Sequence, residues 1–326
     1  MYESYYGLKE RPFLLLPDPD FLYLSKCHET ALTLLEYGFM SQAGFTVITG
    51  EIGSGKTTLS RYILNQIGDE ITIGLITNAQ KSFGELLQWV LLAFGLDYKN
   101  KTKVELYQAF NDFLIDEYSK NHRTVLMIDE AQNLSVETLE ELRMLSNINA
   151  DKHQVLQMVL LGQPELRTML RRPELEQFSQ RISVDFHLKR LDADETKAYI
   201  KHRLTVVGGN PELFDDEACE AAFMLSQGTP RIINRVCDLA LVYGFAEEKQ
   251  QITAEIMLEV TMDKAEIESA TTRLGLSEYS MDTEKQQAST EVQSGVGEAV
   301  AHVQKELQSH LDHAIDKLRK MKLPKF

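Results

Sequence analysis

Apolar runs rich in β-branched residues alternate with helical patterns along the first 190 residues. The runs that we interpret as strands are Phe45–Thr49, Ile71–Thr77, Thr124–Ile128, Val155–Leu161 and Ile182–Leu188. Apolar positions three and four apart predict helices between them, at Lys56–Gln66, Phe83–Phe94, Val104–Ser119 and Val136–Asn147, the last with Ser135 as its N-cap. Because strands that alternate with helices form covered parallel sheets, residues 1–190 are predicted to be an α/β domain with a parallel five-stranded sheet.

After Leu191 the strand pattern stops and only helical periodicity continues. The predicted helices are Asp194–Val206, Asp216–Gln227, Arg231–Phe245 and Ala254–Asp263. Glycine and proline clusters at residues 208–211 and 228–230 separate them. Residues 191–265 are therefore predicted to be a small all-helical domain.

The C-terminal part changes character twice. Residues 266–291 are polar and weakly periodic, which is typical of a flexible linker. Apolar residues then recur every three or four positions from Val296 to Met321, which predicts an amphipathic helix over residues 292–326. Two interpretations of this predicted helix remain: it forms a coiled coil, or it packs on the chain's own body. Basic residues from Lys317 to Lys325 are typical of a solvated helix end, and a peripheral membrane contact is the alternative.

The lengths of the apolar runs, the N-terminal sequence and the net charge argue against a membrane-spanning protein, a secreted protein and an indiscriminate nucleic-acid binder. Every apolar run is far shorter than the ~20 residues that span a bilayer, and the N-terminus lacks the pattern of a secretory signal, so we expect a cytoplasmic location. The net charge of −15 at pH 7 opposes indiscriminate nucleic-acid binding. Cys27, Cys219 and Cys237 lack metal-ligand spacing and receive no role.

The strongest motif is GEIGSGKTT at residues 50–58, which directly follows an apolar run and precedes a predicted helix. Its glycines let backbone N–H groups surround phosphate oxygens, Lys56 can reach the outer phosphates, and the Thr57 hydroxyl can bind Mg²⁺. The sequence thus predicts a nucleoside triphosphate site. Its expected residues are Gly50, Glu51, Ile52, Gly53, Ser54, Gly55, Lys56, Thr57 and Thr58.

A pair of carboxylates follows the third apolar run, in VLMIDEAQ at residues 125–132. Asp129 is the candidate second metal ligand. Glu130, one residue further on, is placed to orient or deprotonate an attacking water. Together with the phosphate loop, this pair predicts nucleotide hydrolysis.

Polar residues also end two other predicted strands. Gln163 ends the fourth apolar run, where its amide could contact the γ-phosphate or the water. Asn78 ends the second run and could hold Glu130 in an inactive position. A polar strand cap is the alternative interpretation for both residues.

Arginines could supply positive charge at the γ-phosphate. Arg181 precedes the last predicted strand, where it could reach a neighbouring subunit's nucleotide, and Arg171 and Arg172 compete for that role. Arg231 opens a helix of the second domain and could fold over the phosphates of its own subunit. Each could instead pair with a local carboxylate.

The order of the motifs TGEIGSGKTT, VLMIDEAQNL, LLGQPEL, FSQRI and GTPRIINRVCDLAL resembles that of AAA+ ATPases, in particular the general secretion pathway protein A group. The likeness runs over residues 2–262. The opening YYGLKERPFLLLPDPDFLYLSKCHETALTLLEYGF is similar to that group's N-terminus, and GFTVITGEIGSGKTTL is most similar to the subgroup encoded near exosortase and exopolysaccharide loci.

The resemblance implies ATP and Mg²⁺ as ligands and a role for each motif. Lys56 and Thr57 would be Walker A residues, and Asp129 and Glu130 the Walker B pair. Gln163 would be sensor 1, Arg181 the finger that acts in trans, and Arg231 sensor 2. The N-terminal segment would lie near the adenine, with Tyr23 and Leu24 as candidates. A ring or filament of identical subunits would complete each site.

Two departures from the family pattern bear on function. Many AAA+ proteins have Asn or Thr at sensor 1, where this chain has Gln163. Full-length secretion members continue into a membrane helix and a peptidoglycan-binding domain, whereas this chain ends in the predicted linker and helix. The sequence predicts an ATPase that drives or times assembly of an envelope-complex partner in secretion or exopolysaccharide export. An ATP-dependent DNA-binding regulator of the transposition target-selector type is the alternative.

Overall fold

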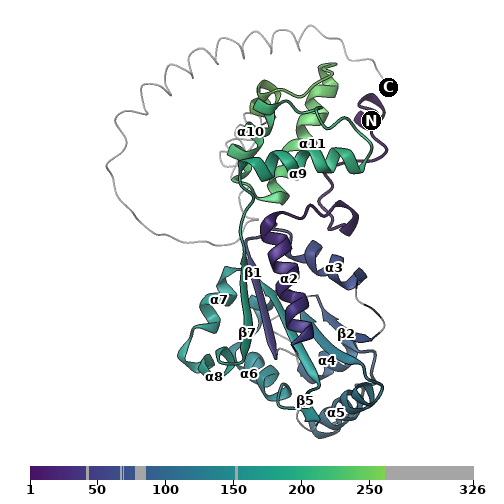
Figure 1. Cartoon of the computed structure of the whole chain (residues 1–326), viewed down its shortest axis with the longest axis vertical. Coiled ribbons are helices and arrows are strands. Elements are labelled where there is room, and N and C mark those ends of the chain that lie inside the picture. The colour runs from purple at the N-terminus through teal and green to yellow at the C-terminus, as the bar shows by residue number, and fades with distance from the viewer. Residues whose placement is uncertain (42–43, 67, 69, 78–85, 151–152, 261–326) are drawn as a thin grey trace, which may run out of the picture. The chain divides into compact units, whose positions relative to one another are not determined.

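The computed structural model describes residues 1–41, 44–66, 68, 70–77, 86–150 and 153–260 (Figure 1). All of them fall in one compact unit, Met1–Glu268. The predicted linker and C-terminal amphipathic helix, and also Asn78, lie outside the described residues. No helix of the described part is long and apolar enough to cross a membrane.

A parallel five-stranded sheet forms the centre of the α/β part. The strands are β1 (Phe45–Gly50), β2 (Ile71–Ile76), β3 (Arg123–Ile128), β6 (Leu156–Gly162) and β7 (Ile182–Leu188). Their order is β2-β3-β6-β1-β7, and every pairing is parallel. This confirms the predicted fold class, with strand bounds that differ by one residue at most. Sequence analysis missed a short antiparallel hairpin, β4 (Asn149–Ala150) with β5 (His153–Gln154).

Helices cover both faces of the sheet, because side chains along each central strand alternate between two apolar cores. Leu126 of β3 and Met158 of β6 belong to one core, and Val125 and Val159 to the other. The first core is closed by α4 (Leu86–Ala93), α5 (Lys103–Ser119), α6 (Val136–Leu145), α7 (Pro164–Leu170) and α8 (Glu176–Ser179). The second is closed by α2 (Lys26–Met40) and α3 (Lys56–Gln66). Of these, α2, α7 and α8 were not predicted.

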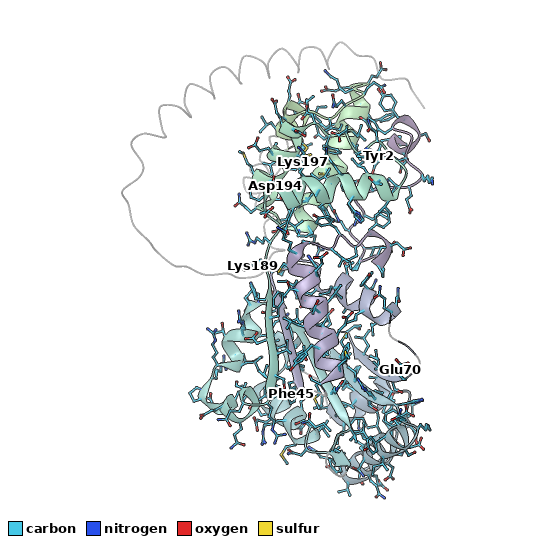
Figure 2. The ribbon with its side chains drawn as sticks, in the orientation of Figure 1. Tyr2, Phe45, Glu70, Lys189, Asp194 and Lys197 are labelled. Carbon is cyan, nitrogen blue, oxygen red and sulfur yellow. The ribbon has the colours of Figure 1, made fainter. Side chains whose placement is uncertain are left out.

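The helical part has a core of its own. It contains α9 (Ala193–Val206), α10 (Asp216–Ser226), α11 (Pro230–Ala246) and the helical residues 254–260. The short helix α1 (Tyr2–Tyr5) packs against α11, and Tyr2, Leu8 and Phe13 are buried in this core. Figure 2 shows Tyr2 beside the helices of this part, with Phe45 in the sheet. Sequence analysis grouped these first residues with the α/β domain, whereas their side chains lie in the helical core.

Residues 14–25 run from the helical core to the sheet, through the 3₁₀ helix η1 (Pro19–Phe21). At their start Leu14 accepts hydrogen bonds from α9 and α11, and at their end Ser25 caps α2. We use the name strap for residues 12–24, which include Pro12, whose carbonyl accepts from Arg203 of α9, and end before the N-cap Ser25. Strap residues line one cavity together with residues that follow β1, β3 and β6, at the end of the sheet where parallel strands place their ligand sites.

Candidate active site

Lys56 sits at the start of α3, behind the loop that follows β1. Its ammonium group donates to the carbonyl of Gly50 at 2.7 Å and to that of Glu51 at 2.9 Å. Burial lowers the pKa of Lys56, and the nearby carboxylates of Glu130 and Asp129 oppose that shift. The lysine is thus a buried cation whose hydrogen bonds, among the residues that the structure describes, go to carbonyls of its own loop.

Two glycines let the loop pass between neighbouring elements. Gly53 has φ +77°, and a Cβ there would lie 2.4 Å from Cβ of Arg231. Gly55 has φ +96°, and its Cβ would lie 3.0 Å from Nε2 of His28. The backbone N–H of Arg231 also donates to the carbonyl of Gly53 at 3.3 Å. Only glycine fits at both positions, since φ is positive and space is absent.

His28 of α2 supports this loop from the other side, a role that sequence analysis missed. Its Nε2 lies 3.2 Å from the carbonyl of Ser54, and its Nδ1 lies 2.8 Å from Oγ of Ser25. Because a carbonyl can only accept, Nε2 carries the hydrogen and Nδ1 accepts from the hydroxyl. Burial lowers the pKa of His28, so the ring is neutral in this arrangement.

Thr57, at the start of α3, and Asp129, directly after β3, lie side by side. The Thr57 hydroxyl donates to Oδ2 of Asp129 at 2.9 Å, and the N–H of Glu130 donates to Oδ1 at 2.9 Å. Burial raises the pKa of Asp129, which the two donors oppose. A hydroxyl and a carboxylate side by side at a phosphate loop are the oxygen ligands that suit Mg²⁺, so the pair fits the predicted metal role.

Glu130 has a left-handed backbone, with φ 55°, at the start of the 3₁₀ helix η2 (Ala131–Asn133). Its Oε2 accepts from Nε2 of Gln132 at 2.5 Å and from Nε2 of Gln163 at 3.1 Å. Gln163, at the end of β6, thus contacts the carboxylate that is predicted to orient the attacking water. Gln132 is a further member of this network that sequence analysis missed.

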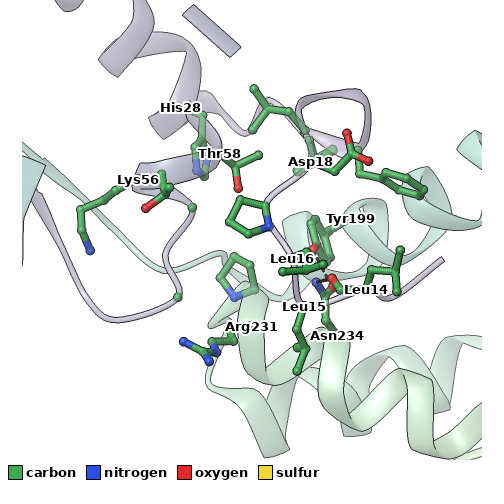
Figure 3. Close-up of a pocket in the computed structure, with 18 of the residues that line it drawn as sticks. Leu14, Leu15, Leu16, Asp18, His28, Lys56, Thr58, Tyr199, Arg231 and Asn234 are labelled. Atoms are coloured by element: carbon green, nitrogen blue, oxygen red, sulfur yellow. Dashed lines mark hydrogen bonds between the residues drawn. The ribbon is translucent and has the colours of Figure 1, made fainter. Parts of the chain in front are cut away.

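A cavity of about 190 Å³ opens in front of these groups (Figure 3). Residues that line its polar side are Gly53, Gly55, Lys56, Thr57, Thr58, Glu130, Gln163 and Arg231. Ile52 and Tyr23 also line it, whereas Gly50, Glu51, Ser54 and Leu24 are not among its lining residues. The cavity therefore collects most of the predicted nucleotide-binding residues around one space.

The other side of the cavity is formed by the strap and the helical part and is mostly apolar, although Asp18, Arg203 and Asn234 also line it. Its apolar lining includes Leu14, Leu15, Leu16, Phe21, Leu22 and Leu191. Arg203 of α9 donates to the carbonyls of Pro12 at 2.5 Å and Leu14 at 3.3 Å. Asn234 of α11 donates to the same Leu14 carbonyl at 3.0 Å and accepts from the Tyr199 hydroxyl at 2.7 Å. These contacts fix the strap on the helical part.

Arg203 is unusual because it is only 6% exposed and bonds backbone carbonyls. Its guanidinium also lies 4.4 Å from the centre of the Phe21 ring, a cation–π contact. Burial lowers the pKa of Arg203. The cation is therefore held by carbonyl dipoles and an aromatic face.

Arg181 lies away from this cavity. Its guanidinium donates to Oγ of Ser146 at 2.7 Å and to the carbonyl of Arg143 at 3.4 Å, at the C-terminal end of α6. Arg171 and Arg172 are exposed at the end of α7. The role of any of the three in a neighbouring subunit's site stays a prediction.

Comparisons with known proteins agree with this geometry. A family model described as the AAA domain matches residues 39–170. The α/β part of the chain has the AAA P-loop fold. The ADP form of ORC2 from Aeropyrum pernix has a TM-score of 0.55 at 16% identity, over 74% of this chain and 71% of that one. Cdc6p from Pyrobaculum aerophilum has a TM-score of 0.55 at 13% identity, over 73% and 68%. At these identities the likeness shows the fold alone.

One relative is similar in sequence as well. General secretion pathway protein A of Aeromonas hydrophila is 40% identical over 253 residues, which are 77% of this chain and 46% of that protein. The chain thus spans less than half the length of this relative. The AAA match and this relative agree with the predicted resemblance to the general secretion pathway protein A group and with a P-loop ATPase domain.

Proposed function

We propose that the protein binds ATP with Mg²⁺ and hydrolyses it to drive or time assembly of a partner complex. The observation that carries this proposal is that Lys56, Thr57 and Glu130 line one cavity, and that Thr57 donates a hydrogen bond to Asp129. A phosphate loop alone would support binding only. The carboxylate pair adds the groups that hydrolysis requires.

The phosphates would bind at the polar side of the cavity. Backbone N–H groups of residues 53–57 and the start of α3 provide donors and a favourable dipole. Lys56, which now bonds two carbonyls of its own loop, would exchange them for phosphate oxygens. Thr57 and Asp129 would hold Mg²⁺, which neutralises phosphate charge when it is bound. Arg231, which lines the cavity, would add positive charge near the γ-phosphate.

Glu130 would orient the attacking water and accept its proton, and Gln163 would contact the water or the γ-phosphate. Both side chains line the cavity and are hydrogen-bonded to one another. The apolar side, including Tyr23 of the strap, would receive the base. This arrangement assigns the phosphates to the α/β part together with Arg231 of α11, and the base to the strap and the rest of the helical part.

The test is ATP hydrolysis and ATP binding by the full chain and two variants. Lys56→Ala should lose both nucleotide binding and phosphate release. Glu130→Gln should keep ATP affinity within about threefold and lose about 100-fold or more in kcat, because it removes the group that accepts the proton. Phosphate release at the wild-type rate by either variant would contradict the proposed site.

We further propose that the protein acts as a ring or filament of identical subunits, with an envelope-complex protein as partner in secretion or exopolysaccharide export. The support is the name and 40% identity of General secretion pathway protein A. A cytoplasmic location is proposed with it, peripheral to the inner membrane through residues 292–326. Co-purification with ATP and then with ADP tests the partner. A chain that stays monomeric with ATP at high concentration would contradict the assembly.

A DNA-binding regulator is the less favoured function, since the net charge is −15 and the ORC2 and Cdc6p likeness shows the fold alone. Retention of duplex DNA in a gel shift with ATP at low salt would favour the DNA-binding function.

A further inference from the structure

Gln132 connects the end of β6 with the Glu130 carboxylate. Its Nε2 donates to Oε2 of Glu130 at 2.5 Å, and its Oε1 accepts from the backbone N–H of Gln163 at 3.0 Å. A Cβ at position 162 would lie 3.1 Å from that same Oε1, so Gly162 gives the amide its space. Both ends of one amide group are therefore occupied.

The orientation of this amide is fixed by its partners. A backbone N–H can only donate, so the group that faces Gln163 must be the amide oxygen. The NH₂ group then faces Glu130, whose carboxylate can accept. Through these two hydrogen bonds, Gln132 connects the backbone at the β6–α7 junction with the side chain of Glu130.

The backbone of Glu130 is also unusual. A left-handed φ of 55° in a residue other than glycine is uncommon and is maintained by surrounding contacts. In the described part of the chain the cavity lining includes Glu130 and Gln163 but not Gln132. Gln132 therefore contacts the carboxylate from outside the set of residues that line the cavity.

We propose that Gln132 is a positioning residue that fixes the Glu130 carboxylate relative to the β6–α7 junction. This rests on the proposed function, in which Glu130 activates water. Gln163 then has two tasks, since its side chain bonds Glu130 and faces the cavity, while its backbone N–H fixes Gln132. When the Gln163 amide turns to the γ-phosphate, Gln132 keeps Glu130 in place. Hydrolysis then depends on an amide outside the cavity.

The first test replaces Gln132 with Met, which keeps the length of the side chain and removes both hydrogen bonds. Gln132→Met in the full chain should lower kcat for ATP hydrolysis about tenfold, because a misplaced base loses rate without losing binding. The KM and the dissociation constant for ATP should stay within about twofold. Gln108→Met, at an exposed position of α5, is the matched control and should keep wild-type kcat. A wild-type kcat in Gln132→Met, or a loss confined to ATP affinity, overturns the proposal.

The second test asks whether Gln132 acts through Glu130. In a Glu130→Gln background, Gln132→Met should change the residual kcat by less than about twofold, because the group that it positions is already absent. A further tenfold loss in that background would show a separate role and would overturn the proposal.

A third test does not depend on activity and separates this inference from the proposed function. Crystal structures of the wild type and Gln132→Met should differ in the position of the Glu130 carboxylate, with the rest of the sheet unchanged. A carboxylate that stays in place without Gln132 overturns the inference even if the protein hydrolyses ATP. A carboxylate that moves supports it even if the wild type releases no phosphate, a result that would count only against the proposed function.

Discussion

The two sides of the cavity are built from different kinds of contact. On the polar side, side chains bond side chains over moderate sequence separations, 72 residues for Thr57 and Asp129 and 33 for Glu130 and Gln163. On the apolar side, side chains of the helical part bond backbone carbonyls of the strap, over 191 residues for Arg203 and Pro12 and 220 for Asn234 and Leu14. The polar side is formed mainly by residues that follow β1, β3 and β6, together with Arg231 of α11. The apolar side joins the N-terminal residues to the helical part.

This difference predicts different consequences of mutation. Contacts on the polar side hold charges near the reacting groups, so their loss should change the rate of hydrolysis more than stability. Contacts on the apolar side hold a segment in place, so their loss should change stability and nucleotide affinity more than the chemical rate. The following variants test that division, from the largest expected effect to the smallest.

Asp129→Asn should have the largest effect on rate. It removes the charge expected to hold Mg²⁺ and should lower kcat about 100-fold. Because burial raises the pKa of Asp129, its negative charge costs more free energy in the folded chain than in the unfolded chain. Loss of this charge should therefore leave the melting temperature unchanged or raise it. Phosphate release and thermal unfolding measure the two effects.

Asp112→Asn is the matched control, because Asp112 is an exposed carboxylate on α5. It should leave both quantities at wild-type values. A melting temperature that falls in Asp129→Asn while hydrolysis continues would reverse the division between the two sides.

Arg203→Met, on the apolar side, should lower stability and ATP affinity and leave kcat nearly unchanged, the opposite of Asp129→Asn. It leaves the carbonyl of Pro12 without its donor and weakens the hold on Leu14, so unfolding should become easier by about 2 kcal/mol. A looser strap should raise the dissociation constant for ATP about tenfold, with kcat at saturation within about twofold. Calorimetry and steady-state kinetics measure these effects.

Arg235→Met, at an exposed position of α11, is the control for removal of an arginine from the helical part. If kcat at saturation falls in Arg203→Met as much as ATP affinity does, the strap takes part in the chemistry and the two sides are not separable.

The same difference explains how much could be predicted from sequence. Residues 50–58, Asp129, Glu130 and Gln163 each follow an apolar strand, and the carboxyl ends of parallel strands meet at one edge. Strand patterns and motif order were therefore enough to place them together. The fold class followed from the same patterns.

The apolar side carried no comparable signal. Arg203 and Asn234 bond carbonyl groups, which every residue type presents, so neither Pro12 nor Leu14 marks the contact. Gln132 was missed because an amide two residues after a carboxylate pair has many uses, and only the N–H of Gln163 defines this one. His28 was missed because the helix that carries it, α2, was not predicted.

His28→Gln should have the smallest effect, and it tests the contact between α2 and the phosphate loop. Burial lowers the pKa of His28 below its ordinary value of 6.5, so between the two pKa values the unfolded chain binds the proton and the folded chain does not. The free energy of unfolding should therefore fall as the pH decreases below about 6.5 and stop falling once the pH is below the folded-state pKa. Glutamine can donate to the Ser54 carbonyl and accept from Ser25 but does not titrate. The decrease in melting temperature between about pH 7.5 and about pH 5.5 should thus be smaller in the variant, by a few degrees at most. An identical decrease in both proteins would mean that His28 is not the neutral, buried support of the loop.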